Sequence, residues 1–241
     1  MFMNLKSGLK IFLIIFLFLL ILFSIYIYLN LEKMGKVDQQ ISGETKIFLP
    51  KEFIKGELSV FDSIKTRRSV RDYAKEPLSL RELSTLLFAT QGITSGYKRA
   101  APSAGALYPI ETYLAVNNVE GLAKGLYHYL SQEHSLVIVK PGDFSREIRK
   151  YCLDQDPLEN AAVNFIWSAV FERTTKKYEE RGLRYIFMEA GHISQNLYLQ
   201  ANSMGLGVVA IGAFDDEKIN QLLDIDSEKE SVIYINSVGR K

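Results

Sequence analysis

Cysteine and histidine are scarce in this chain of 241 residues, and its charges nearly cancel. The one cysteine, Cys152, cannot form an intrachain disulfide, and no neighbouring residue marks it as a redox thiol. His128, His134 and His192 lie far apart without metal-ligand spacing, so no metal site is expected. Lys and Arg total 29 against 28 Asp and Glu, a formal net charge of +1. Such a balance gives no field that would select nucleic acid.

Charge is missing altogether from one long segment near the N-terminus. Residues 11–29 read IFLIIFLFLLILFSIYIYL. As a helix with a rise of ~1.5 Å per residue they would span roughly the hydrocarbon core of a bilayer, which predicts a single-pass membrane anchor. The alternative is a cleaved signal peptide with Lys6 and Lys10 as its basic flank, but no small-x-small cleavage site follows. Lys33 and Lys36 match those two lysines, so the side of the membrane stays open.

The rest of the chain divides by composition into a linker and one folded domain. Residues 1–10 form an N-terminal tail, and residues 30–58, which include the polar run KVDQQISGETK, are interpreted as a linker with an extended lead-in. Residues 59–241 carry the apolar periodicity expected of a folded core.

Caps and periodicity within residues 59–241 predict an α+β domain with a central mixed or antiparallel sheet and a long central helix. Ser59 caps a short helix, and Ser79 with Glu82 forms a capping box for a helix to about Thr90. Further helices are expected over residues 144–152, 177–204 and 215–223, and strands over 111–116, 125–130, 135–140, 162–171, within 205–214, and over 231–239. Apolar Phe187 and Leu199 lie off the main stripe of the long helix, as burial in a dimer would require.

Small and conformationally constrained residues gather in the stretch APSAGALYP, Ala101–Pro109. Two prolines restrict the backbone, and Ala104, Gly105 and Ala106 remove side-chain bulk. The stretch is typical of a backbone platform that approaches a flat ligand closely. The alternative is a tight helix start capped by Ser103.

Two further segments are candidates for ligand contact. TRRSVR, Thr66–Arg71, offers three guanidiniums and a hydroxyl, and the planar fork of arginine suits phosphate oxygens. The same segment is equally compatible with a solvated basic turn. The glycines of GLG, Gly205–Gly207, either end a helix or bring backbone beside a ligand.

Together, RRSVR, PSAGALYP, EAGHISQNLYLQANSMGLG, VVAIGAFDD and the terminal Gly239–Arg240 closely resemble the FMN-dependent nitroreductase family over Ser59–Lys241. Within that family the chain is similar to the SagB-type dehydrogenases related to thiazole and oxazole synthesis. The resemblance implies a nitroreductase-like fold and a homodimer with an FMN at its interface. It also implies that the small residues of the platform lie against the flavin.

By matching motif, the resemblance assigns individual residues to FMN. The phosphate and ribityl chain would be held by Arg67, Arg68, Ser69, Arg71 and Arg240. The isoalloxazine and ribityl side would be lined by Pro102, Ser103 and Ala104, with Ala106 and Tyr108 at positions that are often polar in the family. Ala106 departs from that pattern. The isoalloxazine edge would meet the backbone of Ile211, Gly212 and Ala213.

The segment RTTKKYEERGLRY, residues 173–185, resembles the SagB-type pattern in which a lysine and a tyrosine, here Lys177 and Tyr178, stand beside the flavin. Removing a hydride from a carbon next to nitrogen requires a base for the accompanying proton, and an amine or a phenolate can serve. The alternative is a charged helix start exposed to water. Glu189 and His192, three residues apart, are interpreted as structural residues with satisfied hydrogen bonds.

The resemblance implies an FMN oxidoreductase whose substrate stays open. The uncharged run 11–29 adds the expectation of a membrane anchor, which is not part of the family's usual pattern, and the spacing of His and Cys gives no metal site. A SagB-like enzyme would dehydrogenate an azoline to an azole in a peptide. An enzyme of the broader family would use NAD(P)H as electron donor and reduce a small molecule such as a nitro compound or quinone. The alternatives are a non-catalytic membrane-tethered module that binds flavin or a partner, and a scaffold without a cofactor.

Overall fold

A computed structural model describes residues 46–241 of the chain. The expected tail, the expected anchor over residues 11–29 and residues 30–45 of the expected linker lie outside the described residues. Among residues 46–241, no helix combines the length and apolar character that a membrane crossing needs.

A seven-stranded sheet, in the order β1-β6-β5-β4-β7-β9-β8, forms the centre of the domain. Every pair of neighbouring strands is antiparallel, so the sheet is antiparallel and not mixed. The expected α+β class is confirmed. The strands are β1 (Lys46–Phe48), β4 (Ile110–Val116), β5 (Gly125–Leu130), β6 (Ser135–Pro141), β7 (Val163–Val170), β8 (Leu206–Ile211) and β9 (Glu230–Arg240). A separate two-stranded ribbon pairs β2 (Ile93–Ser95) with β3 (Lys98–Arg99).

Helices begin where the sequence places capping residues. The Ser59 hydroxyl accepts the Asp62 N–H, and the capping box between Ser79 and Glu82 forms as expected. The helices are α2 (Val60–Thr66), α3 (Leu80–Gln91), α4 (Ser145–Tyr151), α5 (Pro157–Asn160), α6 (Glu172–Tyr178), α7 (Arg181–Ser203) and α8 (Asp216–Leu222). A 3₁₀ turn, η1 (Ala104–Ala106), lies within the small-residue stretch.

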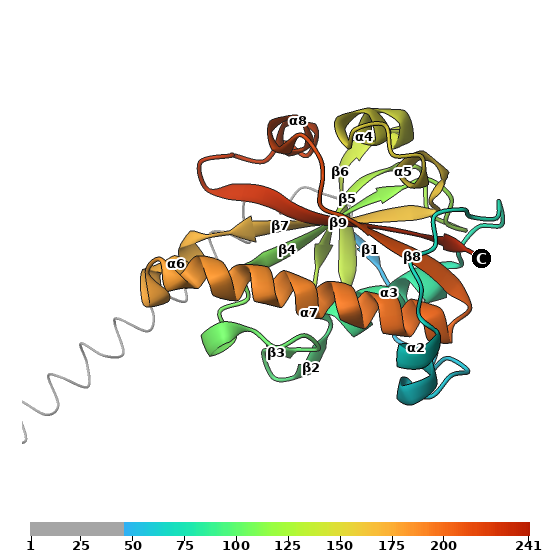
Figure 1. Cartoon of the computed structure of the whole chain (residues 1–241), viewed down its shortest axis with the longest axis horizontal. Helices are drawn as coiled ribbons and strands as arrows, with labels where there is room; N and C mark the ends of the chain where they lie inside the picture. The colour runs from blue at the N-terminus through green and yellow to red at the C-terminus, as the bar shows by residue number, and fades with distance from the viewer. Residues whose placement is uncertain (1–45) are drawn as a thin grey trace, which may run out of the picture. The chain divides into compact units, whose positions relative to one another are not determined.

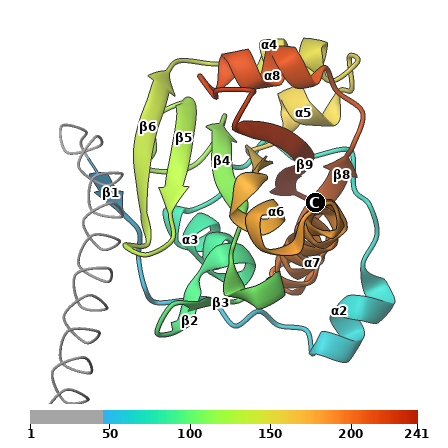
Figure 2. The ribbon, with the colours of Figure 1, turned by 90° about the vertical axis from the view of Figure 1, so that its left-hand side faces the viewer.

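Two apolar layers cover the two faces of the sheet. On one face α7 and α3 bury Trp167, Phe165 and the leucines of α3, and on the other α4, α5 and α8 pack over Ile166 and Ile235 (Figures 1 and 2). Trp167 is fully buried, and its Nε1–H donates to Asn236 Oδ1 at 2.8 Å. The first seven residues of β7, Val163–Ala169, are all buried because the strand lies inside the sheet and helices cover both faces of the sheet.

The long helix expected over residues 177–204 is broken in two. The break occurs at Glu179, which has a φ of +54° that no α-helix allows. Gly182 then packs against the backbone of Thr175, where an added Cβ would lie 3.0 Å from the Thr175 Cα. Lys177 and Tyr178 therefore end the short helix α6 instead of starting α7.

Residues 46–58, expected as the end of the linker, pack on the domain. Strand β1 pairs with β6 at the edge of the sheet (Figure 2). Phe53 stacks on Phe88 of α3 with ring centroids 4.1 Å apart. The Ile54 N–H donates to Thr85 Oγ1 at 3.0 Å, and Gln200 of α7 donates to the Ile54 carbonyl at 3.0 Å. Residues 46–58 are therefore part of the folded domain, and the folded region begins before Ser59.

Candidate functional site

The small-residue stretch folds into a turn held in an uncommon backbone conformation. Gly105, Ala106 and Tyr108 have φ values of +62°, +53° and +47°. Such values strain a residue that carries a Cβ, and strained backbone persists where surrounding contacts determine it. Ser103 lacks a capping bond to η1 and instead accepts the Tyr108 N–H at 2.9 Å. The stretch Ala101–Pro109, called the platform below, is therefore a strained turn held by its own hydrogen bonds and not a helix start capped by Ser103.

Contacts from two other elements hold Tyr108 in place. From β3, the Arg99 N–H donates to the Tyr108 hydroxyl at 3.0 Å, and the Arg99 guanidinium lies 4.9 Å above the Tyr108 ring. From α6, Arg173 donates to the Tyr108 carbonyl at 3.1 Å and pairs with Glu111 of β4. His128, which bonds Glu111, and Arg173 lower the pKa of the Glu111 carboxyl to about 2 against the opposing effect of burial. Arg173 of α6 thus links the Tyr108 carbonyl to the Glu111 carboxylate of the sheet.

The expected catalytic pair meets this platform. A Cβ added at Gly105 would lie 2.8 Å from the Tyr178 hydroxyl and 2.9 Å from Lys177 Nζ. Both polar tips therefore converge on the turn, across the backbone of Gly105. Tyr178 is positioned by an edge-to-face contact with Tyr185, at 5.1 Å, and the Lys177 ammonium lies 5.4 Å from the Tyr178 ring. The structure thus joins two segments that are far apart in sequence.

The arginine-rich segment lies along the C-terminal half of α7. The Arg67 guanidinium lies 5.0 Å above the Tyr198 ring, and the Ser69 hydroxyl is 3.2 Å from the Tyr198 hydroxyl. The same tyrosine oxygen accepts the Ala210 N–H at 2.8 Å. Since the Val70 N–H donates to the Val208 carbonyl at 2.9 Å, this segment runs beside β8. Tyr198 therefore joins the arginine segment to the strand that leads into Ile211.

Arg68 and Arg71 differ from Arg67. The Arg68 guanidinium turns back to the carbonyls of Lys65 and Arg67, at 3.3 and 2.8 Å. Arg71 is exposed and lines a hollow of about 370 Å³ together with Ile211. Gly212 and Ala213 follow as exposed residues after β8. The structure therefore places Arg71 and Ile211 at one hollow and directs Arg68 elsewhere.

Arg240 does not reach the arginine segment. Its two terminal nitrogens each lie 2.8 Å from an oxygen of Glu82, and one also donates to the Pro77 carbonyl. The following residue, Lys241, lies just beyond the end of β9 and reaches a different partner. Lys241 Nζ donates to Asn202 Oδ1 at 2.7 Å. In this arrangement Arg240 does not contribute to the phosphate site expected from the sequence, because its guanidinium forms two hydrogen bonds with the Glu82 carboxylate.

Lys241 supplies the cation that Arg240 does not. Asn202, which accepts from Lys241, also donates to Thr66 Oγ1 at 2.8 Å, one residue before Arg67. Burial lowers the pKa of the Lys241 ammonium from its ordinary value. Sequence reasoning missed Lys241 and Tyr198, since only the register of β9 and the face of α7 reveal them. Arg67, Ser69 and Lys241 together offer two cations and a hydroxyl that fit a phosphate.

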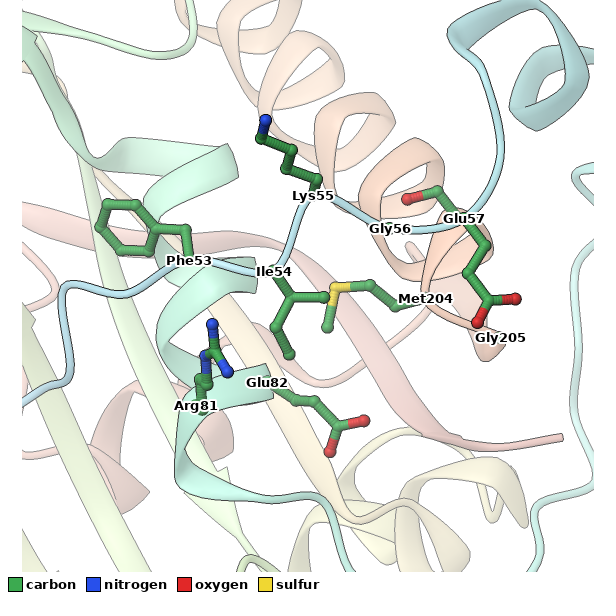
Figure 3. A pocket seen from close by; sticks show the side chains of 10 residues that line it. Phe53, Ile54, Lys55, Gly56, Glu57, Arg81, Glu82, Met204 and Gly205 are labelled. Atoms are coloured by element: carbon green, nitrogen blue, oxygen red, sulfur yellow. The ribbon is translucent and has the colours of Figure 1, made fainter.

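A larger hollow of about 430 Å³ lies where residues 53–57 cross the end of α7. Figure 3 shows the side chains of Ile54 and Met204 next to each other there, with the carboxylates of Glu57 and Glu82 farther out. It contains no residue assigned to FMN by sequence. Within the described part of the chain, no group of three or more His, Cys, Asp or Glu is placed to hold a metal.

Comparisons with known proteins identify the family of this chain. The model of the nitroreductase family matches residues 64–240. MJ1384 of Methanocaldococcus jannaschii, whose name assigns it to the nitroreductases, is 44% identical over 187 residues, covering 77% of this chain and 92% of that protein. The microcin B17-processing protein McbC of Escherichia coli is 29% identical, covering 68% of this chain and 63% of McbC.

A solved structure agrees as well. A protein of Anabaena variabilis assigned to the nitroreductases superposes with a TM-score of 0.72 at 33% identity, covering 82% of this chain and 42% of that one.

Proposed function

The chain belongs to the nitroreductase family, and from this premise we propose that it is an FMN-dependent oxidoreductase of the SagB-like branch. When bound, FMN supplies reversible acceptance of a hydride. The observation that carries the proposal is the convergence of Lys177 and Tyr178 on Gly105 of the platform, 2.9 and 2.8 Å from its Cβ position. A binding module without catalysis has no need for two proton-transfer groups at that point.

The residues that would hold the cofactor form two groups along α7. Arg67, Ser69 and Lys241 gather beside Tyr198 and Asn202, where they suit the phosphate. The platform lies beside the N-terminal half of α7, about 13 Å away along the axis if the rise is ~1.5 Å per residue from Glu189 to Tyr198. Its backbone, free of bulky side chains, suits a flat ring system.

Lys177 and Tyr178 determine the favoured reaction. Dehydrogenating an azoline ring of a peptide removes a hydride from carbon and a proton from the same ring. The Lys177 amine or the Tyr178 oxygen would hold that proton at the platform. The relation to McbC, named for its part in processing microcin B17, supports a peptide substrate. Reduction of a nitro compound or quinone with NAD(P)H would use the same cofactor but would not need this pair.

The proposed enzyme is a homodimer, because α7 and α2 leave apolar side chains in solvent. On α7, Phe187 and Met188 are 55% and 53% exposed. On α2, Val60, Phe61 and Ile64 are 72%, 71% and 58% exposed. Large exposed apolar side chains of this kind are typical of surfaces that another chain covers. A second copy that covers them would complete the FMN site at the interface, as the family resemblance implies.

We also retain the single-pass anchor over residues 11–29 as a proposal, which rests on the uncharged apolar sequence alone. Extraction of membranes with alkaline carbonate tests it. An anchored chain stays in the pellet, and a chain released to the supernatant excludes an integral anchor.

The experiment that tests the function is an anaerobic absorbance titration of the full chain, purified in mild detergent and supplied with FMN. We expect a protein-bound flavin spectrum that bleaches with a synthetic thiazoline-containing peptide and persists with NADH or NADPH. Bleaching by the nicotinamides alone would assign the chain to the reductases. Bound flavin that no donor reduces would support the non-catalytic module, and absence of flavin binding would overturn the proposal.

A further inference from the structure

A buried carboxyl lies on α7, the helix that contacts η1 of the platform. Glu189 of α7 is 2% exposed, and its Oε1 is buried without a hydrogen-bond partner among residues 46–241. The Nε of Arg99, which faces it from β3, is also buried and unpartnered within this range. The expectation that Glu189 is a structural residue with satisfied hydrogen bonds therefore fails for one of its two oxygens. Unpaired buried polar atoms are costly, so two of them beside a candidate site call for a functional reason.

The surroundings of Glu189 bring the pKa of its carboxyl close to neutral pH. Burial raises the pKa of the Glu189 carboxyl to about 7, while the Ser103 hydroxyl and the Arg99 guanidinium favour its anion. The neighbouring η1 and α3 contribute the uncharged Ser103 and Gln91. The other charged or titratable groups that act on Arg99 are Glu111 of β4, Arg173 of α6 and Tyr108 of the platform, and Lys177 and Tyr178 of α6 converge on Gly105.

Ser103 connects this carboxyl to the platform. Its oxygen accepts the Tyr108 N–H at 2.9 Å, which occupies one of its two lone pairs. One hydrogen and one lone pair remain. An ionised Glu189 can only accept, so it takes the Ser103 hydrogen and leaves a lone pair toward the platform. A protonated Glu189 donates to that lone pair and frees the Ser103 hydrogen to point outward.

We propose that Glu189 is a positioning residue that, by holding or releasing one proton, sets whether Ser103 donates to or accepts from the molecule bound at the platform. The inference rests on the proposed function, since it takes the platform as the place where FMN lies. A full transfer is balanced: the Glu189 carboxyl gives its proton to the Ser103 oxygen, and the Ser103 hydroxyl gives its own to the bound molecule. The reverse transfer restores both groups, and no oxidant or reductant takes part.

The proton on Glu189 can be measured without any cofactor. Difference infrared spectroscopy of the apo chain across neutral pH should show the carbonyl band of a protonated carboxyl titrating near pH 7. Glu189→Gln should remove the band. Ser103→Ala should move its inflection to higher pH, because the hydroxyl that favours the anion is lost. The control is Ser194→Ala, which removes another buried hydroxyl of α7, bonded to Asn236, and should leave the inflection in place.

The effect on the platform is measured with FMN bound. A pH titration of the flavin absorbance should show an inflection near 7 in the wild type that both Glu189→Gln and Ser103→Ala abolish, and that Ser103→Thr restores. A purely structural role would lower the thermal midpoint in Glu189→Gln but leave the inflection intact, and this would overturn the inference.

The two proposals fail separately. A wild-type chain that binds FMN and bleaches with the peptide, yet shows no infrared band near neutral pH, leaves the function standing and removes the role of Glu189. A chain that binds no FMN at all removes the proposed function, and with it the outward role of Ser103.

Discussion

Tyr198 and Asn202 near the C-terminal end of α7 hydrogen-bond to other elements, whereas Glu189 in its N-terminal half keeps one buried oxygen without a partner among residues 46–241. Tyr198 and Asn202 bond Ser69, the Ala210 N–H, Thr66 and Lys241 at 2.7 to 3.2 Å. Glu189 and its neighbour Arg99 each keep a buried unpartnered atom within residues 46–241. The C-terminal end therefore holds its polar groups through bonds within the chain, whereas near the platform buried polar atoms stay unpaired within the described residues.

The backbone differs in the same way between the two ends. Residues 67–71 run as extended chain beside β8, with no positive φ among them. The platform at the other end holds Ala106 and Tyr108 at positive φ, which costs on the order of 1 kcal/mol or more per residue. Strain that the surrounding contacts maintain is typical of places where chemistry occurs. The contrast separates a binding end from a reactive end of one helix.

Removing the amine at the reactive end should have the largest effect. Lys177→Ala should slow flavin reduction by a thiazoline peptide by roughly 10²- to 10⁴-fold, the usual contribution of a general base, while FMN content stays the same. Anaerobic stopped-flow absorbance measures the rate. Lys176→Ala is the matched control, since Lys176 pairs with Glu172 on the exposed side of α6. An unchanged rate in Lys177→Ala would return Lys177 to the solvated surface.

Lowering the pH should reduce the free energy of unfolding through protonation of Glu111, which lies at the reactive end. The folded pKa of Glu111 is about 2, below its ordinary value of 4.5, so its stabilising effect is complete above pH 4.5 and is lost as pH falls toward 2. The shift corresponds to about 3 kcal/mol in the free energy of unfolding. Urea unfolding followed by the fluorescence of Trp167 measures it. Glu111→Gln should be less stable at neutral pH and show a flatter acid profile; equal profiles would contradict the prediction.

Charge reversal at the binding end should separate two adjacent arginines. Arg67→Glu should weaken FMN binding about 100-fold, because a charged hydrogen bond contributes about 1.5–3 kcal/mol and repulsion adds to its loss. Arg68→Glu should weaken it far less, since the Arg68 guanidinium turns to the Lys65 and Arg67 carbonyls. Titration of FMN fluorescence measures both. Equal losses would mean that the phosphate senses only the summed charge of the segment.

Loss of Arg240 should affect stability rather than cofactor binding. Arg240→Ala leaves Glu82, whose side chain is 11% exposed, without its cation and should cost about 2 kcal/mol of unfolding free energy. Adding Glu82→Gln should recover part of that loss. Lys241→Ala, by contrast, should weaken FMN binding with little change in stability. A reversed pattern would restore Arg240 to the phosphate site.

Local signals predicted most elements of the fold. The Ser59 cap, the Ser79–Glu82 box and the alternating strands appear where the sequence places them because each depends on neighbours a few residues away. The break at Glu179 was not predictable in this way, since the charged residues around it carry no turn signal. It depends on the close approach of Gly182 to Thr175, a contact between two helices.

The candidate site was predictable as segments but not as an arrangement. The order of motifs identified the arginine segment, the platform and the Lys177–Tyr178 pair. Only the fold decided that this pair meets Gly105, that Lys241 and not Arg240 faces the arginine segment, and that Glu189 is buried with an unpartnered oxygen.

The sequence by itself determined the chemical composition of this protein's site: small residues for close approach, arginines for an anion, and a lysine beside a tyrosine for a proton. Tertiary structure alone decided which side chains share a face and which are removed from water. The physical reason is that direction and burial arise from strand register and helix packing, which sum contributions from the whole chain. A motif specifies its residue types locally, but solvent exclusion and pairing belong to the assembled core.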